Sequence, residues 1–183
     1  MSHQHECRAL LINGTVGVGK TSVADAIGSQ LRESRLPGSV IDLDWLGNAW
    51  PTPEDDPFNL SLTLQNVAAG AANAITFGAR HLILAGVVEN HDQRAQYAAA
   101  VGMPLKLCRL RADLDTVRDR LRLRHPEDPK ALAWHLHRCG ELNAILDQAR
   151  VDDFIVDTTD RTIEQTAVDV IGRWFADAIP VQQ

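Results

Sequence analysis

One stretch near the start of the chain has the residue types and spacing of a phosphate-binding loop. It matches the pattern G-x-x-x-x-G-K-[ST] in full and reads Gly14-Thr15-Val16-Gly17-Val18-Gly19-Lys20-Thr21. Glycines let the backbone fold around a phosphate with its N–H groups pointing inward, and the following helix N-terminus adds partial positive charge. The lysine of this pattern reaches the β- and γ-phosphates, and the threonine hydroxyl binds Mg²⁺. A plain glycine-rich turn is the alternative, but such a turn needs no Lys-Thr. The pattern therefore predicts triphosphate binding through Gly14 to Thr21 and the adjoining Ser22.

Two carboxylates follow the second apolar run of the sequence. Asp42 and Asp44 stand two apart at the end of a predicted strand over residues 39–44, so both are expected on the same side of it. Open parallel sheets bind ligands at the carboxyl ends of their strands, which places Asp44 near a phosphoryl acceptor. A hydroxyl acceptor needs a group that takes or orients its proton, and a carboxylate can do this. The alternative is a turn with two solvated aspartates.

Basic residues are concentrated in one segment of an acidic protein. The 183-residue chain has a formal net charge of −6, yet Pro104 to Arg124 contains seven basic and three acidic residues, a local charge of +4. This distribution favours a small anionic ligand and argues against a polyanion such as nucleic acid. A solvated helix face with internal ion pairs is the alternative. His125, His135 and His137 follow, but no third ligand has the spacing of a metal site.

Short apolar runs alternate with helical patterns, and these elements must position the residues above. Strands are predicted at residues 9–13, 39–44, 81–88, 105–110 and 154–157. Helices are predicted at 20–35, 60–75 and 91–101, from 114 to just before Pro126, and at 132–146 and 163–178. Continuous apolar strands separated by helices are typical of a parallel sheet covered on both faces. No repeat or linker divides the chain, so we expect a single α/β domain over residues 1–183.

With this loop, this length and acids near residue 44, the sequence resembles the small P-loop kinases. These include shikimate kinase, gluconate kinase, adenylylsulfate kinase, nucleoside monophosphate kinases and chloramphenicol phosphotransferase-like proteins. The resemblance implies a P-loop three-layer sandwich with a five-stranded parallel sheet in the order 2-3-1-4-5. It also implies a site for ATP and Mg²⁺, an acceptor-binding region at about residues 45–78 and a small helical lid at about residues 114–138.

The resemblance further implies roles for individual residues near the phosphates. Shikimate kinase has a D-x-D at the position of the two acids. Carried over, Asp42 assists Mg²⁺ together with Thr21, and Asp44 acts as the base or orients the acceptor. Lid arginines of such kinases neutralise the transferring phosphoryl group, and we select Arg118 and Arg122 for this role. Pairing of these arginines with acids along the same helix is the alternative.

Three further residues are candidates on the same grounds. Arg138 follows in the second lid helix and is expected to bind the nucleotide. Arg161 lies in the loop after the last strand, which faces adenine in the related folds, and it could stack on the base; an N-cap cluster for the last helix is the alternative for this loop. Glu89 lies at the end of the third strand, where it could contact substrate or Mg²⁺-bound water, and a surface acid is an equal alternative.

The predicted acceptor region has an unusual composition. Trp45 and Trp50 stand among prolines and acids, and no Arg or Lys occurs from Asp42 to Ile75. Nucleotide monophosphate kinases grip the acceptor phosphate with several arginines, so this composition favours an acceptor without phosphate. The two tryptophans could contact a cationic or sugar-like acceptor, or they could belong to a capped, partly buried loop.

These observations predict an ATP- and Mg²⁺-dependent kinase that phosphorylates a hydroxyl of a small metabolite or antibiotic. A nucleoside or nucleotide kinase is the alternative enzyme, and a non-catalytic ATP-binding regulator is the alternative of another class. No N-K-x-D tetrapeptide of a guanine-binding switch occurs. We expect no nucleic-acid or membrane partner, and a monomer or homodimer. The polar N-terminus and three widely spaced cysteines favour a cytoplasmic location.

Overall fold

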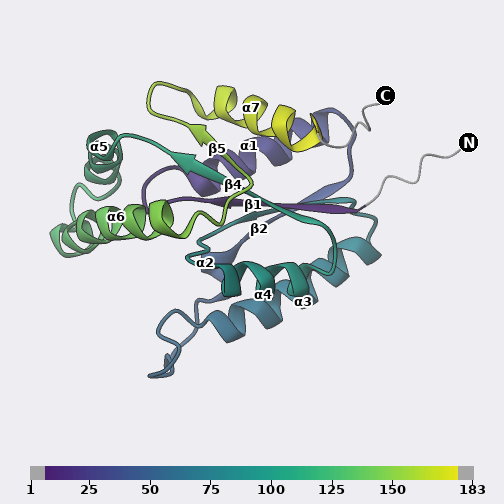
Figure 1. Cartoon of the computed structure of the whole chain (residues 1–183), viewed down its shortest axis with the longest axis horizontal. Helices are drawn as coiled ribbons and strands as arrows, with labels where there is room; N and C mark the ends of the chain where they lie inside the picture. Colours follow the sequence, from purple (N-terminus) through teal and green to yellow (C-terminus); the bar gives the residue numbers. More distant parts are fainter. Residues whose placement is uncertain (1–6, 177–183) are drawn as a thin grey trace, which may run out of the picture.

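The computed structural model describes residues 7–176 and contains a five-stranded parallel sheet with helices on both faces (Figure 1). The strands are β1 (Arg8–Asn13), β2 (Gly38–Asp42), β3 (His81–Ala85), β4 (Leu105–Arg111) and β5 (Phe154–Asp157). The helices are α1 (Lys20–Glu33), α2 (Leu43–Leu46), α3 (Leu60–Thr76), α4 (His91–Val101), α5 (Leu114–Arg124), α6 (Pro129–Ala149) and α7 (Ile163–Ala176). The strand order is β2-β3-β1-β4-β5, which confirms the predicted fold class and sheet order.

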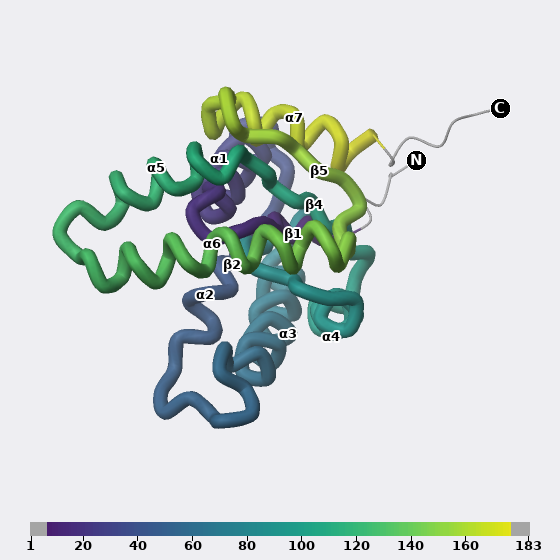
Figure 2. The backbone as a smooth tube through the Cα atoms, turned by 60° about the vertical axis from the view of Figure 1, so that its left-hand side comes forward, coloured from purple at the N-terminus to yellow at the C-terminus, as the bar shows by residue number. Residues whose placement is uncertain are grey.

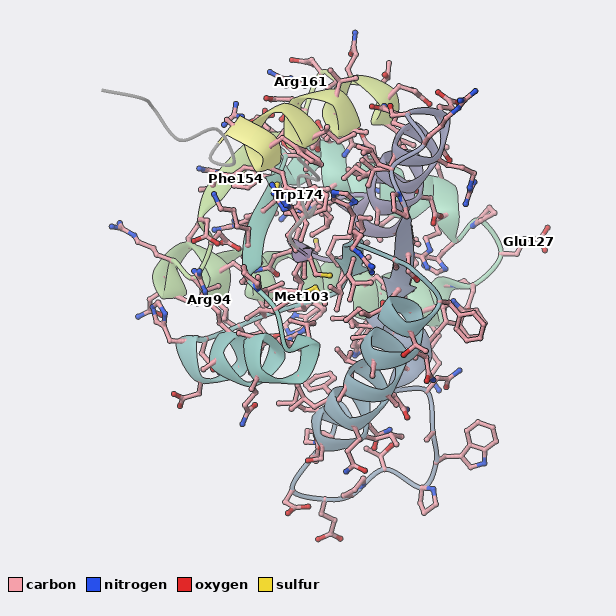
Figure 3. The ribbon with its side chains drawn as sticks, turned by 90° about the vertical axis from the view of Figure 1, so that its right-hand side faces the viewer. Arg94, Met103, Glu127, Phe154, Arg161 and Trp174 are labelled. Carbon is pink, nitrogen blue, oxygen red and sulfur yellow. The ribbon has the colours of Figure 1, made fainter. Side chains whose placement is uncertain are left out.

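Apolar side chains are buried on both faces of the sheet. Successive residues of a strand point to opposite faces, so Leu10 and Ile12 of β1 join one cluster while Ala9 and Leu11 join the other. The first cluster is closed by α1 and α7, and the second by α3 and α4 (Figure 1). Figure 3 shows Trp174 pointing inward from α7, where its ring meets His81 edge-on at 5.8 Å between centroids. The continuous apolar runs are therefore explained by burial on two sides.

Helices α5 and α6 pack against each other and extend beyond the sheet as a hairpin (Figure 2). Asp128 caps α6 by accepting a hydrogen bond from the backbone N–H of Ala131, and Pro129 occupies the first helical turn. Figure 3 shows Glu127 in the turn between the two helices, with its side chain pointing outward. The hairpin spans residues 114–149 and so includes residues 114–138, the segment that the resemblance assigned to the lid; its role as a lid stays a prediction.

Some element bounds differ from the sequence prediction. The second strand ends at Asp42 and not at Asp44, because the Asp42 side chain accepts a hydrogen bond from the N–H of Asp44 and starts the short helix α2. The third strand ends at Ala85, and the first helix ends at Glu33. The end of the last predicted helix, residues 177–178, lies outside the described residues. Within residues 7–176, no helix is long and apolar enough to cross a bilayer.

Parallel pairing brings the carboxyl ends of the central strands to one edge of the sheet. Asp42 is level with Ala85 of β3, which is level with Ile12 of β1. Asn13 is level with Arg109 of β4. The residues that follow these strands, including the phosphate loop and the start of α2, therefore meet at this edge.

Candidate functional site

The loop from Gly14 to Gly19 joins β1 to α1 and has the shape of an anion cradle. Gly17 and Gly19 have φ angles of +82° and +104°, a region that favours glycine because other residues are strained there. No side chain caps the N-terminus of α1. The first-turn amides of this helix thus have no partner within the helix and are free to bind phosphate oxygens.

Lys20 lies at the centre of this cradle and donates a hydrogen bond from Nζ to the Thr15 carbonyl at 3.1 Å. Burial lowers the pKa of Lys20 to about 8, while the nearby carboxylates of Asp44 and Asp42 oppose that shift and Arg124 adds to it. The ammonium group therefore lacks full solvation before any anion arrives. A phosphate group would supply the missing negative charge.

Thr21 and Asp42 form a pair of oxygen ligands suited to a hard cation. The Thr21 hydroxyl donates a hydrogen bond to Asp42 Oδ2 at 2.8 Å, and Asp42 Oδ1 accepts one from the Asp44 N–H at 2.9 Å. Mg²⁺ prefers carboxylate and hydroxyl oxygens and usually keeps several waters, so this pair fits the ion. The structure thus brings together the two residues predicted for the metal.

Asp44 lies in the first turn of α2, exposed and near Lys20 and Asp42. The strand alternation used to predict its direction does not apply, because Asp44 is helical. Its position depends instead on Leu43, which packs so closely on Gly86 that a Cβ at Gly86 would lie 2.3 Å from Leu43 Cδ1. The start of α2 is therefore fixed against the end of β3, with Asp44 at the same edge as the phosphate loop.

The two lid arginines selected from the sequence are paired within α5. Arg118 forms an ion pair with Asp115 at 2.9 Å, and Arg122 forms one with Asp119 at 2.5 Å. Each acid lies three residues earlier in the same helix, which is the alternative arrangement expected from the sequence. Exposed pairs of this kind contribute about 0–1 kcal/mol, so either arginine can exchange its partner for a phosphate at little cost. Their catalytic role stays a prediction.

Arg120 was not selected, although the structure places it against the phosphate loop. It donates to the Val18 carbonyl at 3.3 Å and to the Thr158 hydroxyl and carbonyl at 3.2 and 2.7 Å. The next residue, Leu121, packs on Gly17, where an added Cβ would lie 2.7 Å from Leu121 Cγ. The sequence signal for Arg120 is its place next to Leu121, which belongs to the apolar face of the predicted helix.

Arg138 of α6 lies beside Glu89 and Phe58, and its predicted contact with the nucleotide stays a prediction. Its guanidinium forms an ion pair with Glu89 and a second with Glu141 at 2.9 Å, and it lies 5.4 Å from the centre of the Phe58 ring. The structure thus brings together Glu89 and Arg138, which the sequence analysis treated separately. Arg138 thus links α6 to the segment after β3 and to the segment before α3.

Arg161 lies at the outside of the molecule near the start of α7 (Figure 3) and pairs with Asp169 at 2.6 Å. The neighbouring Thr158 is buried and binds Arg120. Thr159 N–H donates to Asp157, and Thr162 N–H donates to Gln165 at the start of α7, as expected for a capping loop. The adenine contact of Arg161 stays a prediction.

Two buried polar residues hold the phosphate loop in place, and the first of them, Asn13, was not a candidate from the sequence. The Asn13 amide donates to the Val88 carbonyl at 3.1 Å and to Asp152 at 2.8 Å, and its oxygen accepts from Gly14 and Val88. Thr15 donates to the Cys139 carbonyl of α6 at 2.7 Å. A polar residue ending a buried strand was the only signal for Asn13.

Residues 45–59, which run from the end of α2 to the start of α3, belong to the predicted acceptor region and are called the acceptor loop below. Polar side chains hold this segment against α3. Asp56 accepts hydrogen bonds from the N–H groups of Leu60 and Ser61, which lowers the pKa of its carboxyl. Asn59 donates to the carbonyls of Gly47 and Ala49 at 2.9 Å. Trp45 and Trp50 nevertheless remain exposed, so the loop holds its shape without burying its tryptophans.

No protein-family model matches the sequence, and no curated protein matches it in sequence. Solved structures do match over most of the chain. The tunicamycin resistance protein of Deinococcus radiodurans is 19% identical with a TM-score of 0.64, over 92% of this chain and 96% of that chain. The APS kinase of Mycobacterium tuberculosis, solved with AMPPNP and APS, is 22% identical with a TM-score of 0.63, over 93% and 99%.

A gluconokinase from Sinorhizobium meliloti is 16% identical with a TM-score of 0.61, over 93% of this chain and 94% of that chain. The chain has the fold of the small P-loop kinases. Within this P-loop kinase fold, the matched structures are named for different small molecules, and their identities to this chain are similarly low. The fold therefore locates the site without naming its acceptor.

Proposed function

We propose that this protein is an ATP-dependent phosphotransferase that moves the γ-phosphoryl group of ATP to a hydroxyl of a small, non-phosphorylated metabolite or antibiotic. The observation that carries the proposal is the convergence of Lys20, the Thr21–Asp42 pair and Asp44 at one edge of the sheet. A nucleotide-binding loop alone would need no carboxylate beyond the metal pair.

The chemistry follows from the charges of these groups. Lys20 and the loop amides hold the triphosphate and offset charge on the phosphoryl oxygens. Asp44 takes the proton of the acceptor hydroxyl, and the oxygen of that hydroxyl bonds to the γ-phosphorus. The bond from that phosphorus to the β–γ bridging oxygen breaks, and ADP leaves with the electron pair. Arg118 and Arg122 stabilise the transferring group once the lid closes.

Thr21 and Asp42 would hold Mg²⁺, supported by their short contact and their oxygen donors. Bound there, the ion would supply positive charge that offsets the charge of the triphosphate.

The deciding experiment measures the turnover of the Asp44→Asn variant with an acceptor that the unmodified protein phosphorylates. We expect kcat to fall by about 10²- to 10⁴-fold, because the amide cannot take a proton, while KM for ATP changes little. Asp25→Asn, an exposed acid on α1, is the matched control. Turnover that survives Asp44→Asn would contradict the role of Asp44.

An ADP-release screen against nucleosides, sugars and aminoglycosides separates the acceptor classes. A nucleotide kinase is the less favoured alternative, since residues 42–75 contain no Arg or Lys to grip an acceptor phosphate. ATP binding without transfer to any acceptor would favour a regulatory protein. We also propose a cytoplasmic location, in keeping with the free Cys7, Cys108 and Cys139.

A further inference from the structure

The acceptor side of the molecule has a strongly one-sided charge. From Leu36 to Ala79 the sequence contains no Lys, Arg or His and has five acids: Asp42, Asp44, Glu54, Asp55 and Asp56. The Asp42 carboxylate accepts a hydrogen bond from Thr21 and is assigned to the proposed metal. The Asp56 carboxylate accepts hydrogen bonds from backbone N–H groups at the N-terminus of α3. Asp44, Glu54 and Asp55 remain exposed. An anionic acceptor would meet repulsion here.

Arg138 reaches this side from α6 but does not reverse the charge. Its guanidinium is bound to two carboxylates, Glu89 and Glu141, and only 13% of its side chain is exposed. It also lies over the Phe58 ring at 5.4 Å from the centroid. The contact shows that an aromatic ring of the acceptor loop already stabilises a planar organic cation through its π face.

Aromatic faces are displayed beside these acids. Trp45, Trp50 and Phe58, which all belong to the acceptor loop, are 77%, 84% and 64% exposed. Scattered exposed aromatics are ordinary, but three in one loop beside unpaired carboxylates are the components that recognise organic cations.

Tyr97 of α4 supplies a further polar group beside these acids. The residue is 3% exposed, and within residues 7–176 its hydroxyl makes no hydrogen bond. Tyr97 packs in the same cluster as Leu43, the residue before Asp44. Burial raises the pKa of Tyr97 to about 12, and the charges of Asp44 and Asp56 raise it too, so the hydroxyl stays protonated and lies near the acids of the acceptor side.

Resting on the proposed function, we propose that the acceptor is an organic cation: an alcohol that carries a protonated amine beside an apolar or aromatic face. The ammonium group lies among the exposed carboxylates and ring faces of the acceptor loop. The apolar face packs on Trp45, and the Tyr97 hydroxyl hydrogen-bonds a polar group of the ligand. The reacting hydroxyl is presented to Asp44.

Three probes with the same ring and the same benzylic hydroxyl test this proposal by charge alone. They are 2-amino-1-phenylethanol, its neutral N-acetyl derivative and the anion mandelate. Binding is measured by calorimetry on the full chain with AMPPNP and Mg²⁺ present, so that no transfer is needed. We expect the amine to bind about tenfold or more tightly than the N-acetyl derivative, and mandelate most weakly. The preference should shrink as salt is raised.

Matched variants locate the binding. Trp45→Ala and Asp55→Asn should each weaken amine binding, whereas Phe77→Ala, an exposed aromatic at the far end of α3, should not. Tyr97→Phe removes only the hydroxyl and should cost about threefold to tenfold in affinity. Circular dichroism verifies that each variant is folded.

The results separate this inference from the proposed function. Equal or tighter binding of the neutral or anionic probe, or amine binding weaker than about 10 mM, would overturn the inference. ADP release is then measured with amine, neutral and anionic alcohols. Release that is fastest with neutral or anionic alcohols supports a kinase and contradicts the cationic acceptor. Selective amine binding without ADP release from any alcohol supports the cation site and contradicts the kinase.

Discussion

At the scale of single residues, the electrostatics of the site depend on Lys20 and the two carboxylates beside it. Burial removes water from the ammonium group, and Asp42 and Asp44 compensate only in part, so the pKa of Lys20 stays below its ordinary value. A charged group held in this way destabilises the free protein and favours an anionic ligand. The phosphate loop therefore holds an incompletely compensated positive charge before phosphate binds.

This imbalance predicts that Lys20→Met stabilises the ligand-free protein. The pKa is about 8 when folded and 10.5 ordinarily, so between these values the unfolded chain binds more protons and stability rises with pH. The penalty is therefore fully present below pH 8. We expect a higher Tm for Lys20→Met at pH 7, a smaller gain near pH 10 and no binding of AMPPNP. Thermal unfolding followed by circular dichroism measures this, with the exposed Lys130→Met as control; a lower Tm at pH 7 would contradict it.

Arg120 and Arg122 stand two residues apart but differ in their surroundings. Arg120 makes three hydrogen bonds to the phosphate loop and the Thr158 loop, whereas Arg122 pairs with Asp119 on the surface. We expect Arg120→Ala to lower the free energy of unfolding by about 1–3 kcal/mol and to weaken ATP binding. Arg122→Ala should leave stability nearly unchanged and reduce kcat alone. Urea unfolding and steady-state kinetics compare the two, and equal stability losses would refute the distinction.

At the scale of elements, the short helix α2 decides where Asp44 lies. Its first residue, Leu43, occupies the space over Gly86, and Asp42 caps it. Four residues cannot form a stable helix on their own, so α2 depends on these two contacts. Its absence from the sequence prediction has the same cause, since no local pattern signals so short a helix.

We therefore predict that Gly86→Ala displaces α2. The added Cβ would lie 2.3 Å from Leu43 Cδ1, so Leu43 must move and Asp44 moves with it. We expect kcat to fall at least about tenfold, because small misplacements near reacting atoms are costly. Adding Leu43→Ala should restore part of the activity. Gly140→Ala in α6, where a Cβ meets nothing within 4 Å, is the control. Full activity of Gly86→Ala would show that the position of α2 does not matter.

At the scale of the whole molecule, one sheet carries both halves of the core. The helices α1 and α7 close one face and α3 and α4 the other, and both clusters contain residues of β1, β3 and β4. If the strands of the sheet separated, the apolar residues buried on both faces would become exposed. The predicted single domain is in keeping with this arrangement and stays a prediction.

We predict one cooperative unfolding transition. Far-ultraviolet circular dichroism should report the helices of both faces, and fluorescence should include the buried Trp174 of the α7 face. The two signals should coincide across a urea titration, as expected when no intermediate is populated. Two separated transitions would contradict a single domain and place a boundary between the faces.

Local pattern alone determined much of this protein. Apolar runs and helical spacing predicted all five strands and the six longer helices to within a few residues, because the periods of 2 and 3.6 reflect which face is buried. The phosphate loop was predicted because its function needs adjacent residues. The order of the strands came from the resemblance, not from periodicity.

Tertiary structure decided the contacts between residues far apart in sequence. Helical spacing could not tell that Arg120, and not Arg118 or Arg122, turns toward Val18 and Thr158, since the rotation of α5 is fixed by Leu121 packing on Gly17. Likewise, only the packing of α6 brings Arg138 to Glu89 and Phe58. Local sequence sets which face of an element is apolar. Which side chains then meet depends on how those faces fit together.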